Sequence, residues 1–187
     1  MFLLRRPTDR QAGEFLRAQE GQPLSYSPAG MSLGAPPRGF AVDRTRVVLG
    51  SGEACFRSAA AVLRECRFFS DTGIEVITEP GPPAVGKTLV LLASHVGLWS
   101  LNGSRVVSVV DGPRRYGFAY GTLRGHSLRG EESFVVSLGD DGAVTLEITA
   151  LSRPGQPLAW LGYPLVRRFQ GVFAARAAGA VLAACQG

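Results

Sequence analysis

The sequence contains few cysteines, few histidines and a single lysine. The three cysteines form no C-x-x-C pair, which argues against a disulfide framework and favours a reducing compartment. His95 and His126 are the only histidines, and neither lies within a spacing typical of metal ligands. Nucleophilic catalysis is not indicated either, because Cys66 lies on a predicted apolar helix and no serine stands in a nucleophile elbow. We therefore expect no metal and no other cofactor.

Long hydrophobic runs are absent as well. No uninterrupted apolar run reaches the roughly 18 residues that a membrane-spanning helix needs. The N-terminal segment MFLLRRP is too short to supply the apolar core of a signal peptide. We expect a cytoplasmic protein without a membrane span.

The chain is basic, and its positive charge comes almost entirely from arginine. It carries 20 lysines and arginines against 15 acidic residues, a net charge of +5, and Lys87 is the only lysine. Such a surface is commonly just solvated. Arginine forks also suit phosphate and other anions, so an arginine-rich interaction module stays open as an alternative. Nucleic acid is not an expected partner, because no RNA-binding signature is present.

Length and composition predict one packed domain with an N-terminal extension. Of the 187 residues, 45% are hydrophobic and 19% are charged, so a packed core is feasible. The 24 glycines and 12 prolines favour many turns and short strands. Residues 1–40, a short helix followed by a Pro/Gly-rich arm, are expected to pack on a single domain formed by residues 41–187.

Hydrophobic periodicity predicts a strand, a helix, several antiparallel strands and a long C-terminal helix, in that order. The apolar run Leu89–Leu101 is compatible with a bent strand or a short helix, and the Asn102-Gly103 pair after it is typical of a tight hairpin. A curved antiparallel sheet of about six to seven strands, wrapped on the long helix, would bury these elements, so the fold class is α+β. The expected helices are 9–19, 53–68 and one that starts near Pro164, and the expected strands are 44–49, 74–78, 105–111, 116–123, 132–138 and 143–151.

The segment Gly81–Thr88 reads GPPAVGKT and satisfies the phosphate-loop pattern G-x-x-x-x-G-K-[ST]. A phosphate loop must connect a parallel strand to a helix whose N-terminus faces the anion. Here only antiparallel hairpins are predicted downstream, and Pro82 and Pro83 lack two amides that could hold phosphate. We expect a turn that enters a strand, without nucleotide binding.

Two predicted strands and the loop between them contain the candidate site. His126 lies in the loop, and strand alternation places Glu132 on the inward face with Phe134 and leaves Glu131 facing out. A histidine and a carboxylate can anchor a ligand or act as general acid and base, but they can also be purely structural. The residues predicted to line an apolar cavity around them are Tyr116, Phe118, Tyr120, Phe134, Leu146 and Ile148, with Trp160 and Tyr163 at its mouth. The same aromatic row could instead form solid core or stack on single-stranded nucleic acid.

The motif GFAYGTL at residues 117–123, with the residues that follow it, resembles the bacterial and plant domain of unknown function family nineteen-ninety. The matching residues downstream are Gly125-His126, Gly130-Glu131-Glu132, Phe134, Ser152-Arg153-Pro154, Pro164-Leu165, Arg168 and Gln170. The resemblance runs from about Leu24 to Ala180. The family has no assigned activity, but it is similar to START-like (SRPBCC) helix-grip proteins. Those proteins commonly hold apolar ligands between the sheet and the C-terminal helix, and a few are cyclases or hydrolases, so the resemblance implies a helix-grip fold.

The residues and the resemblance together predict a protein that binds a small, largely apolar molecule. We expect Glu132 and His126 to be the polar anchors of its cavity. The alternative is a small hydrolase-like or cyclase-like enzyme in which His126 and Glu132 act as acid and base. The chemical identity of the ligand is not encoded in any motif of this sequence.

Overall fold

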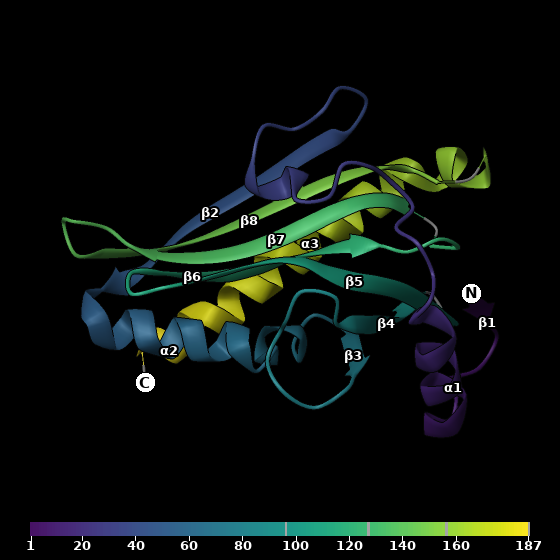
Figure 1. Cartoon of the computed structure of the whole chain (residues 1–187), viewed down its shortest axis with the longest axis horizontal. Coiled ribbons are helices and arrows are strands. Elements are labelled where there is room, and N and C mark those ends of the chain that lie inside the picture. The colour runs from purple at the N-terminus through teal and green to yellow at the C-terminus, as the bar shows by residue number, and fades with distance from the viewer. Residues whose placement is uncertain (96, 127, 156, 187) are drawn as a thin grey trace.

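The structure is a computed structural model that describes residues 1–95, 97–126, 128–155 and 157–186. The side chains of His95 and of residues 157–166 lie outside the described part. Three longer helices, two short 3-10 turns and eight strands follow one another within the described residues (Figure 1). They are β1 (Phe2–Leu3), α1 (Asp9–Gln19), η1 (Met31–Leu33), β2 (Ala41–Ser51), α2 (Gly52–Arg64), η2 (Arg67–Phe69), β3 (Ile74–Thr78), β4 (Thr88–His95), β5 (Leu98–Gly112), β6 (Arg115–Thr122), β7 (Leu128–Leu138), β8 (Ala143–Pro154) and α3 (Pro157–Gln186).

The strands form one antiparallel sheet. Its order is β2-β8-β7-β6-β5-β4-β3, and β1 adds a short pairing to β5 outside this path. The long strands β5, β7 and β8 stay hydrogen-bonded over most of their length, and β3 and β2 form the two edges. The predicted α+β class and the predicted curved sheet on a C-terminal helix are therefore confirmed.

The helix α3 crosses one face of the sheet, and α2 packs beside it (Figure 1). This inner face contains the main core, because alternate residues of β6, β7 and β8 point toward the two helices. Phenylalanines dominate the core: the rings of Phe68 and Phe134 have centroids 4.6 Å apart, and Phe134 meets Phe173 of α3 at 6.1 Å. On α3, the side chains of Phe173, Ala177 and Val181 are buried against this core.

The outer face of the sheet is covered at one end by the N-terminal segment. The helix α1 starts at a capping box in which Thr8 and Gln11 exchange backbone and side-chain hydrogen bonds. Leu16 of this helix is buried against Val90, Leu92 and Leu101 of β4 and β5. The arm after α1 then runs across β6 and β7, where Leu24 forms an isolated bridge with Leu123 of the same sheet.

One sequence-based prediction about the turns is wrong. Asn102 and Gly103 do not form a hairpin turn but lie within β5, where they pair with Leu91 and Val90 of β4. The reversal occurs earlier, between His95 and Leu98. The pair is therefore held in the sheet by its neighbours on β4, and the side chain of Asn102 donates a hydrogen bond to Ser100 Oγ at 3.0 Å. Local turn propensity was overridden by strand pairing.

Candidate functional site

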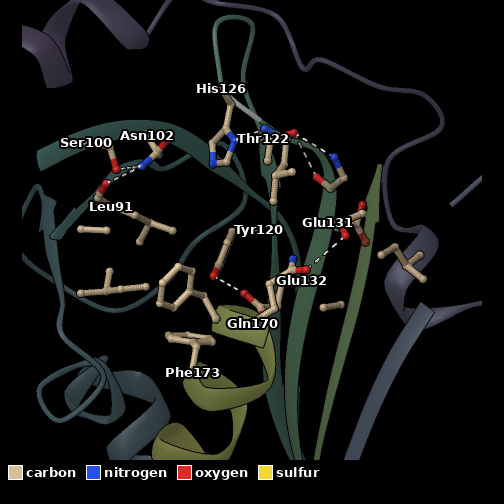
Figure 2. A pocket seen from close by; sticks show the side chains of 18 of the residues that line it. Leu91, Ser100, Asn102, Tyr120, Thr122, His126, Glu131, Glu132, Gln170 and Phe173 are labelled. Atoms are coloured by element: carbon tan, nitrogen blue, oxygen red, sulfur yellow. Dashed lines mark hydrogen bonds between the residues drawn. The ribbon is translucent and has the colours of Figure 1, made fainter. Parts of the chain in front are cut away.

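A cavity of about 380 Å³ lies between the inner face of the sheet and α3. Its volume falls within the range of pockets that hold small molecules. Figure 2 shows side chains from the strands and from α3 converging on it. The lining is mostly apolar and comprises Phe2, Ile74, Leu91, Ala93, Ser100, Asn102, Tyr120, Thr122, His126, Leu128, Gly130, Glu131, Glu132, Ala150, Leu151, Ser152, Phe169, Gln170 and Phe173.

Glu132 supplies the carboxyl group within this cavity. It stands on β7 directly opposite Tyr120 of β6 and Ala150 of β8, so all three side chains share the inner face. The hydroxyl of Tyr120 donates a short hydrogen bond to Glu132 Oε2 (Figure 2). Tyr120 is 5% exposed, and the centroid of its ring lies 6.0 Å from that of Phe134. This packing fixes the direction of the Tyr120 hydroxyl. The strand pairing therefore holds one oxygen of the carboxyl group in place.

Burial changes the acidity of this pair. Desolvation raises the pKa of Glu132 to about 7, although the Tyr120 hydrogen bond opposes the shift, and the charge of Asp43 adds to it. Desolvation and the adjacent carboxyl also raise the pKa of Tyr120 well above its usual value. Near neutral pH the Glu132 carboxyl group is thus divided between its neutral and charged forms. It can accept a hydrogen bond from a ligand or exchange a proton with one.

His126 lies at the other end of the cavity from Phe173 (Figure 2). The backbone amide of Leu128 donates to His126 Nδ1 at 3.0 Å, so the neutral ring carries its proton on Nε2. Desolvation, together with the charge of the nearby N-terminal ammonium group, lowers the pKa of His126 to about 4. The imidazole is therefore neutral at physiological pH and presents an N–H donor.

Further polar groups line the cavity, and motif analysis did not assign them to the site. Asn102 and Ser100 of β5 are hydrogen-bonded to each other, and Ser152 Oγ of β8 lies 3.4 Å from Gln170 Oε1 of α3. Gln170 had a usable signal, because it lies three residues before the buried Phe173 and therefore on the same side of the helix. Asn102 had none, because its sequence context is typical of a turn.

The predicted site residues occupy three different places. Tyr120, His126 and Glu132 line the cavity. Trp160 and Tyr163, predicted at the mouth, have side chains outside the described residues. The remaining predicted residues pack in the main core instead of on the cavity wall, because facing rings and aliphatic side chains fill the space around them: Tyr116, Phe118, Phe134, Leu146 and Ile148.

Glu131 faces out from the sheet, as the alternation predicts, but it does not reach solvent. Its side chain points to the outer face, as alternation requires, but it is 2% exposed because the N-terminal arm covers it. Four donors meet its carboxylate: Tyr26 Oη at 2.6 Å, Gly30 N and Ser32 N at 2.8 Å each, and Ser32 Oγ at 2.5 Å. Gly121 of β6 makes room for this cluster, since a Cβ there would lie 1.9 Å from Tyr26 Oη. Through these hydrogen bonds, Glu131 holds the N-terminal arm against the outer face of the sheet.

The segment Gly81–Thr88 does not have the geometry of a phosphate loop. It connects β3 to β4, which are antiparallel neighbours, and no helix follows it. The Nζ atom of Lys87 donates to the carbonyl oxygens of Pro80, Gly81 and Pro82 within its own loop. The segment is therefore a turn that leads into β4, as expected from the sequence, and Lys87 closes this turn.

Two other kinds of site find little support among the described residues. Burial raises the pKa of the Cys66 thiol to about 11, so this cysteine is not activated as a nucleophile. Cys66 lies in the turn after α2, not on the helix itself.

No group of three His, Cys, Asp or Glu side chains in the described part of the chain is arranged to hold a metal ion. None of the helices described is long and apolar enough to span a membrane.

Residues 25–180 match the family described as Domain of unknown function (DUF1990). The chain belongs to this family. A relative from Deinococcus radiodurans, a UPF0548 protein, is 41% identical over 177 residues, which cover 89% of this chain and 89% of the relative. The family resemblance drawn from the GFAYGTL, GH and GEE motifs is therefore confirmed.

Solved structures with little sequence similarity share the fold. The ZhuI aromatase/cyclase from Streptomyces sp. R1128 superposes with a TM-score of 0.55 at 16% identity, covering 79% of this chain and 94% of its own. Norcoclaurine synthase from Thalictrum flavum, in complex with dopamine and hydroxybenzaldehyde, gives a TM-score of 0.51 at 12% identity and covers 76% of this chain and 84% of its own. At these identities the likeness establishes a helix-grip type of fold and nothing about chemistry.

Proposed function

We propose that this DUF1990 protein binds a small, largely apolar molecule in the cavity between its sheet and α3. The observation that carries the proposal is the cavity itself, about 380 Å³ lined mainly by apolar side chains, with a few polar groups facing it. Pockets that bind small molecules have this composition, because apolar walls supply affinity and isolated polar groups fix orientation.

The polar groups indicate how such a molecule would be oriented. Tyr120 occupies one side of the Glu132 carboxyl group, so a ligand hydroxyl or amine could donate a hydrogen bond to the other side. His126 presents an N–H donor at the opposite end, where a ligand oxygen would accept its hydrogen bond. The expected ligand is therefore an apolar body with a polar group near each end.

The fold relatives are compatible with this role. One of them is an aromatase/cyclase, and another has been solved with dopamine and hydroxybenzaldehyde bound. Those names describe the relatives, and their chemistry is not transferred to this chain. They support the proposal only in that the same arrangement of sheet and helix accommodates small aromatic molecules elsewhere.

The binding test uses a neutral apolar dye, N-phenyl-1-naphthylamine, and a variant that fills the cavity. Ala150 lines the cavity beside Glu132, so Ala150→Phe should occupy the space that the dye needs. We expect the affinity of the dye to fall about tenfold or more, while circular dichroism shows an intact fold. The control is Ala54→Phe, the same substitution at an exposed position on α2. Equal dye affinity in wild type and Ala150→Phe would contradict the proposal.

An enzyme is the second candidate, and the acidity of Glu132 is the observation that favours it. A carboxyl group with a pKa of about 7 can take up and release protons at neutral pH. The neutral His126 is a weak base, so Glu132 is the better candidate for proton transfer. The test follows the exchange of the α-protons of 1-tetralone in D2O by NMR. Faster exchange with wild type than with Glu132→Gln supports an enzyme, and equal rates contradict it.

A further inference from the structure

A second cavity of about 250 Å³ adjoins the first at His126. It lies beside the loop between β6 and β7 and is lined by Leu24, Ser25, Arg124, Gly125, His126, Arg129 and Gly155. In contrast to the mostly apolar residues of the main cavity, two arginines, Arg124 and Arg129, are among the residues that line this space. His126 is the side chain that lines both cavities.

The two arginines of the second cavity carry charge that the described residues do not neutralise. Arg124 and Arg129 are exposed, and neither forms an ion pair with a carboxylate of the described chain. Glu131 and Glu132, the carboxylates closest in sequence, are already engaged by Ser32 and Tyr120 and their neighbours. The positive charge at this cavity is therefore available to a bound anion.

The backbone holds the two arginines on either side of His126. The amide of Arg124 donates to Pro23 O at 3.0 Å, which ties the loop to the N-terminal arm. Arg129 belongs to β7 and pairs with Arg153 of β8. Two guanidinium groups that flank a common space repel each other unless an anion lies between them. Guanidinium forks match the geometry of carboxylate and phosphate oxygens.

The orientation of His126 connects this charge to the main cavity. Its Nδ1 is occupied by the amide of Leu128, so the free donor is Nε2–H. An anionic oxygen bound at the arginines is a suitable acceptor for that donor. A ligand that extends past His126 would place its charged group among the arginines and its apolar part against the walls of the main cavity.

We propose that the ligand is an anionic amphiphile, whose apolar body fills the main cavity and whose carboxylate or phosphate binds Arg124, Arg129 and His126 in the second cavity. This inference rests on the proposed function, because it assumes that the main cavity holds a ligand. It adds the chemical class of that ligand and a second binding subsite. The shared chemistry is an anionic oxygen group at the end of an apolar chain.

The experiment compares decan-1-ol, decanoate, decyl phosphate and inorganic phosphate by isothermal titration calorimetry with the full-length protein. We expect at least one of the two anionic probes to bind about tenfold or more tightly than decan-1-ol, with an advantage that decreases as salt screens the charges. The preferred anion distinguishes a carboxylate ligand from a phosphate ligand. Inorganic phosphate alone should bind far more weakly than the preferred probe, because it gains nothing from the main cavity.

The double variant Arg124→Gln/Arg129→Gln tests the subsite. It should remove the advantage of the anion and leave the affinity for decan-1-ol within about twofold of wild type. The matched control is Arg44→Gln/Arg46→Gln, which removes the same charge from two exposed arginines of β2 and should retain the advantage. This control excludes a general effect of net charge.

Four results would overturn the inference. Equal affinity for the alcohol and both anions, or an anion advantage that survives in Arg124→Gln/Arg129→Gln, would reject the anionic subsite and leave the proposed function intact. Binding of inorganic phosphate as tight as that of decyl phosphate would show that the arginines act apart from the main cavity. Failure of all the decyl probes together with failure of the neutral dye would reject both proposals.

Discussion

Glu131 and Glu132 are neighbours on β7 whose environments differ completely. Glu131 faces the outer surface of the sheet, where four donors from the N-terminal arm surround its carboxylate. Glu132 faces the inner surface, where Tyr120 donates one hydrogen bond and a cavity lies alongside. One step along a strand thus separates a carboxylate whose oxygens are fully engaged from one that still has capacity for a ligand.

The comparison separates structural from functional carboxylates. A buried charge with four donors contributes to stability through its contacts, because solvation lost on burial is replaced by hydrogen bonds. A buried carboxyl group with one donor stays partly neutral and costs stability when it ionises. Such an arrangement persists in proteins chiefly where a site requires it. The predictions below test this distinction in order of decreasing effect.

The largest expected difference is between the two glutamine variants. Glu131→Gln removes the charge and places an amide NH2 group against N–H and O–H donors, so we expect it to lower the free energy of unfolding by about 3 kcal/mol. Glu132→Gln removes a carboxyl group whose ionisation costs the folded state stability at pH 7, so the variant should lose no more than about 1 kcal/mol there and can be more stable than wild type. Urea denaturation of both variants measures the two values. Equal losses would contradict the distinction.

The second prediction concerns pH between 4.5 and 6.5. The pKa of Glu132 is raised on folding from 4.5 to about 7. Its contribution to the free energy of unfolding is therefore complete below pH 4.5 and is lost as the pH rises through about 7. The pKa of His126 is lowered from 6.5 to about 4, so its contribution is complete above pH 6.5 and is lost as the pH falls through about 4. In the wild-type protein, the contributions of Glu132 and His126 to stability therefore change with pH in opposite directions.

A variant that lacks one of these two groups should therefore show how the other group alone makes stability depend on pH. Relative to wild type, Glu132→Gln should gain stability from pH 4.5 to 6.5, and His126→Gln should lose it, by about 2 kcal/mol in each direction. Denaturation at three pH values provides the data. Because the other carboxylates are common to all three proteins, their titration cancels in the differences. Parallel pH profiles for all three proteins would show that the cavity does not perturb these groups.

The two tyrosines that donate to these glutamates offer a smaller, matched comparison. Tyr26→Phe removes one of four donors to an ionised Glu131 and should cost roughly 1–2 kcal/mol. Tyr120→Phe should cost less, and because its hydrogen bond lowers the pKa of Glu132, the variant should raise that pKa above about 7. Carbon-detected NMR titration of the glutamate carboxyl groups measures the shift. An unchanged pKa of Glu132 in Tyr120→Phe would contradict the hydrogen bond assigned between Tyr120 and Glu132.

The smallest expected effect is at the loop that imitates a phosphate-binding sequence. Lys87 is half-buried, and its hydrogen bonds to carbonyl oxygens of its own turn are exposed to solvent, so Lys87→Ala should change stability by less than about 0.5 kcal/mol. It should also leave any weak affinity for ATP unchanged in equilibrium dialysis. A clear loss of ATP binding in this variant would restore the nucleotide hypothesis.

Sequence periodicity was sufficient for much of this fold. Alternation along residues 132–138 and 143–151 correctly separated the two faces of β7 and β8, because a strand forces successive side chains to opposite sides. Helical spacing identified α1, α2 and α3, although α3 begins at Pro157, before the expected Pro164. These features depend on local geometry, which a single sequence contains.

Features that depend on contacts between distant segments were missed. Glu131 was correctly expected to face out, but nothing in its neighbourhood reveals that Tyr26, 105 residues earlier, lies above it and covers it. Asn102 was expected in a turn because an Asn-Gly pair is typical of turns. Its actual place in β5 depends on pairing with Leu91 of β4, which the local sequence does not show. Cavity volume is equally invisible to periodicity: Tyr120 and Phe134 share one face, yet one lines the cavity and the other is packed in the core.

The most direct test of a ligand-binding cavity is native mass spectrometry of the protein purified from its own cells, alongside the Ala150→Phe variant prepared in the same way. The account predicts a small, largely apolar compound at one copy per wild-type chain, released on denaturation and absent or strongly reduced in the variant. An empty wild-type protein that also fails to bind the neutral dye would contradict it.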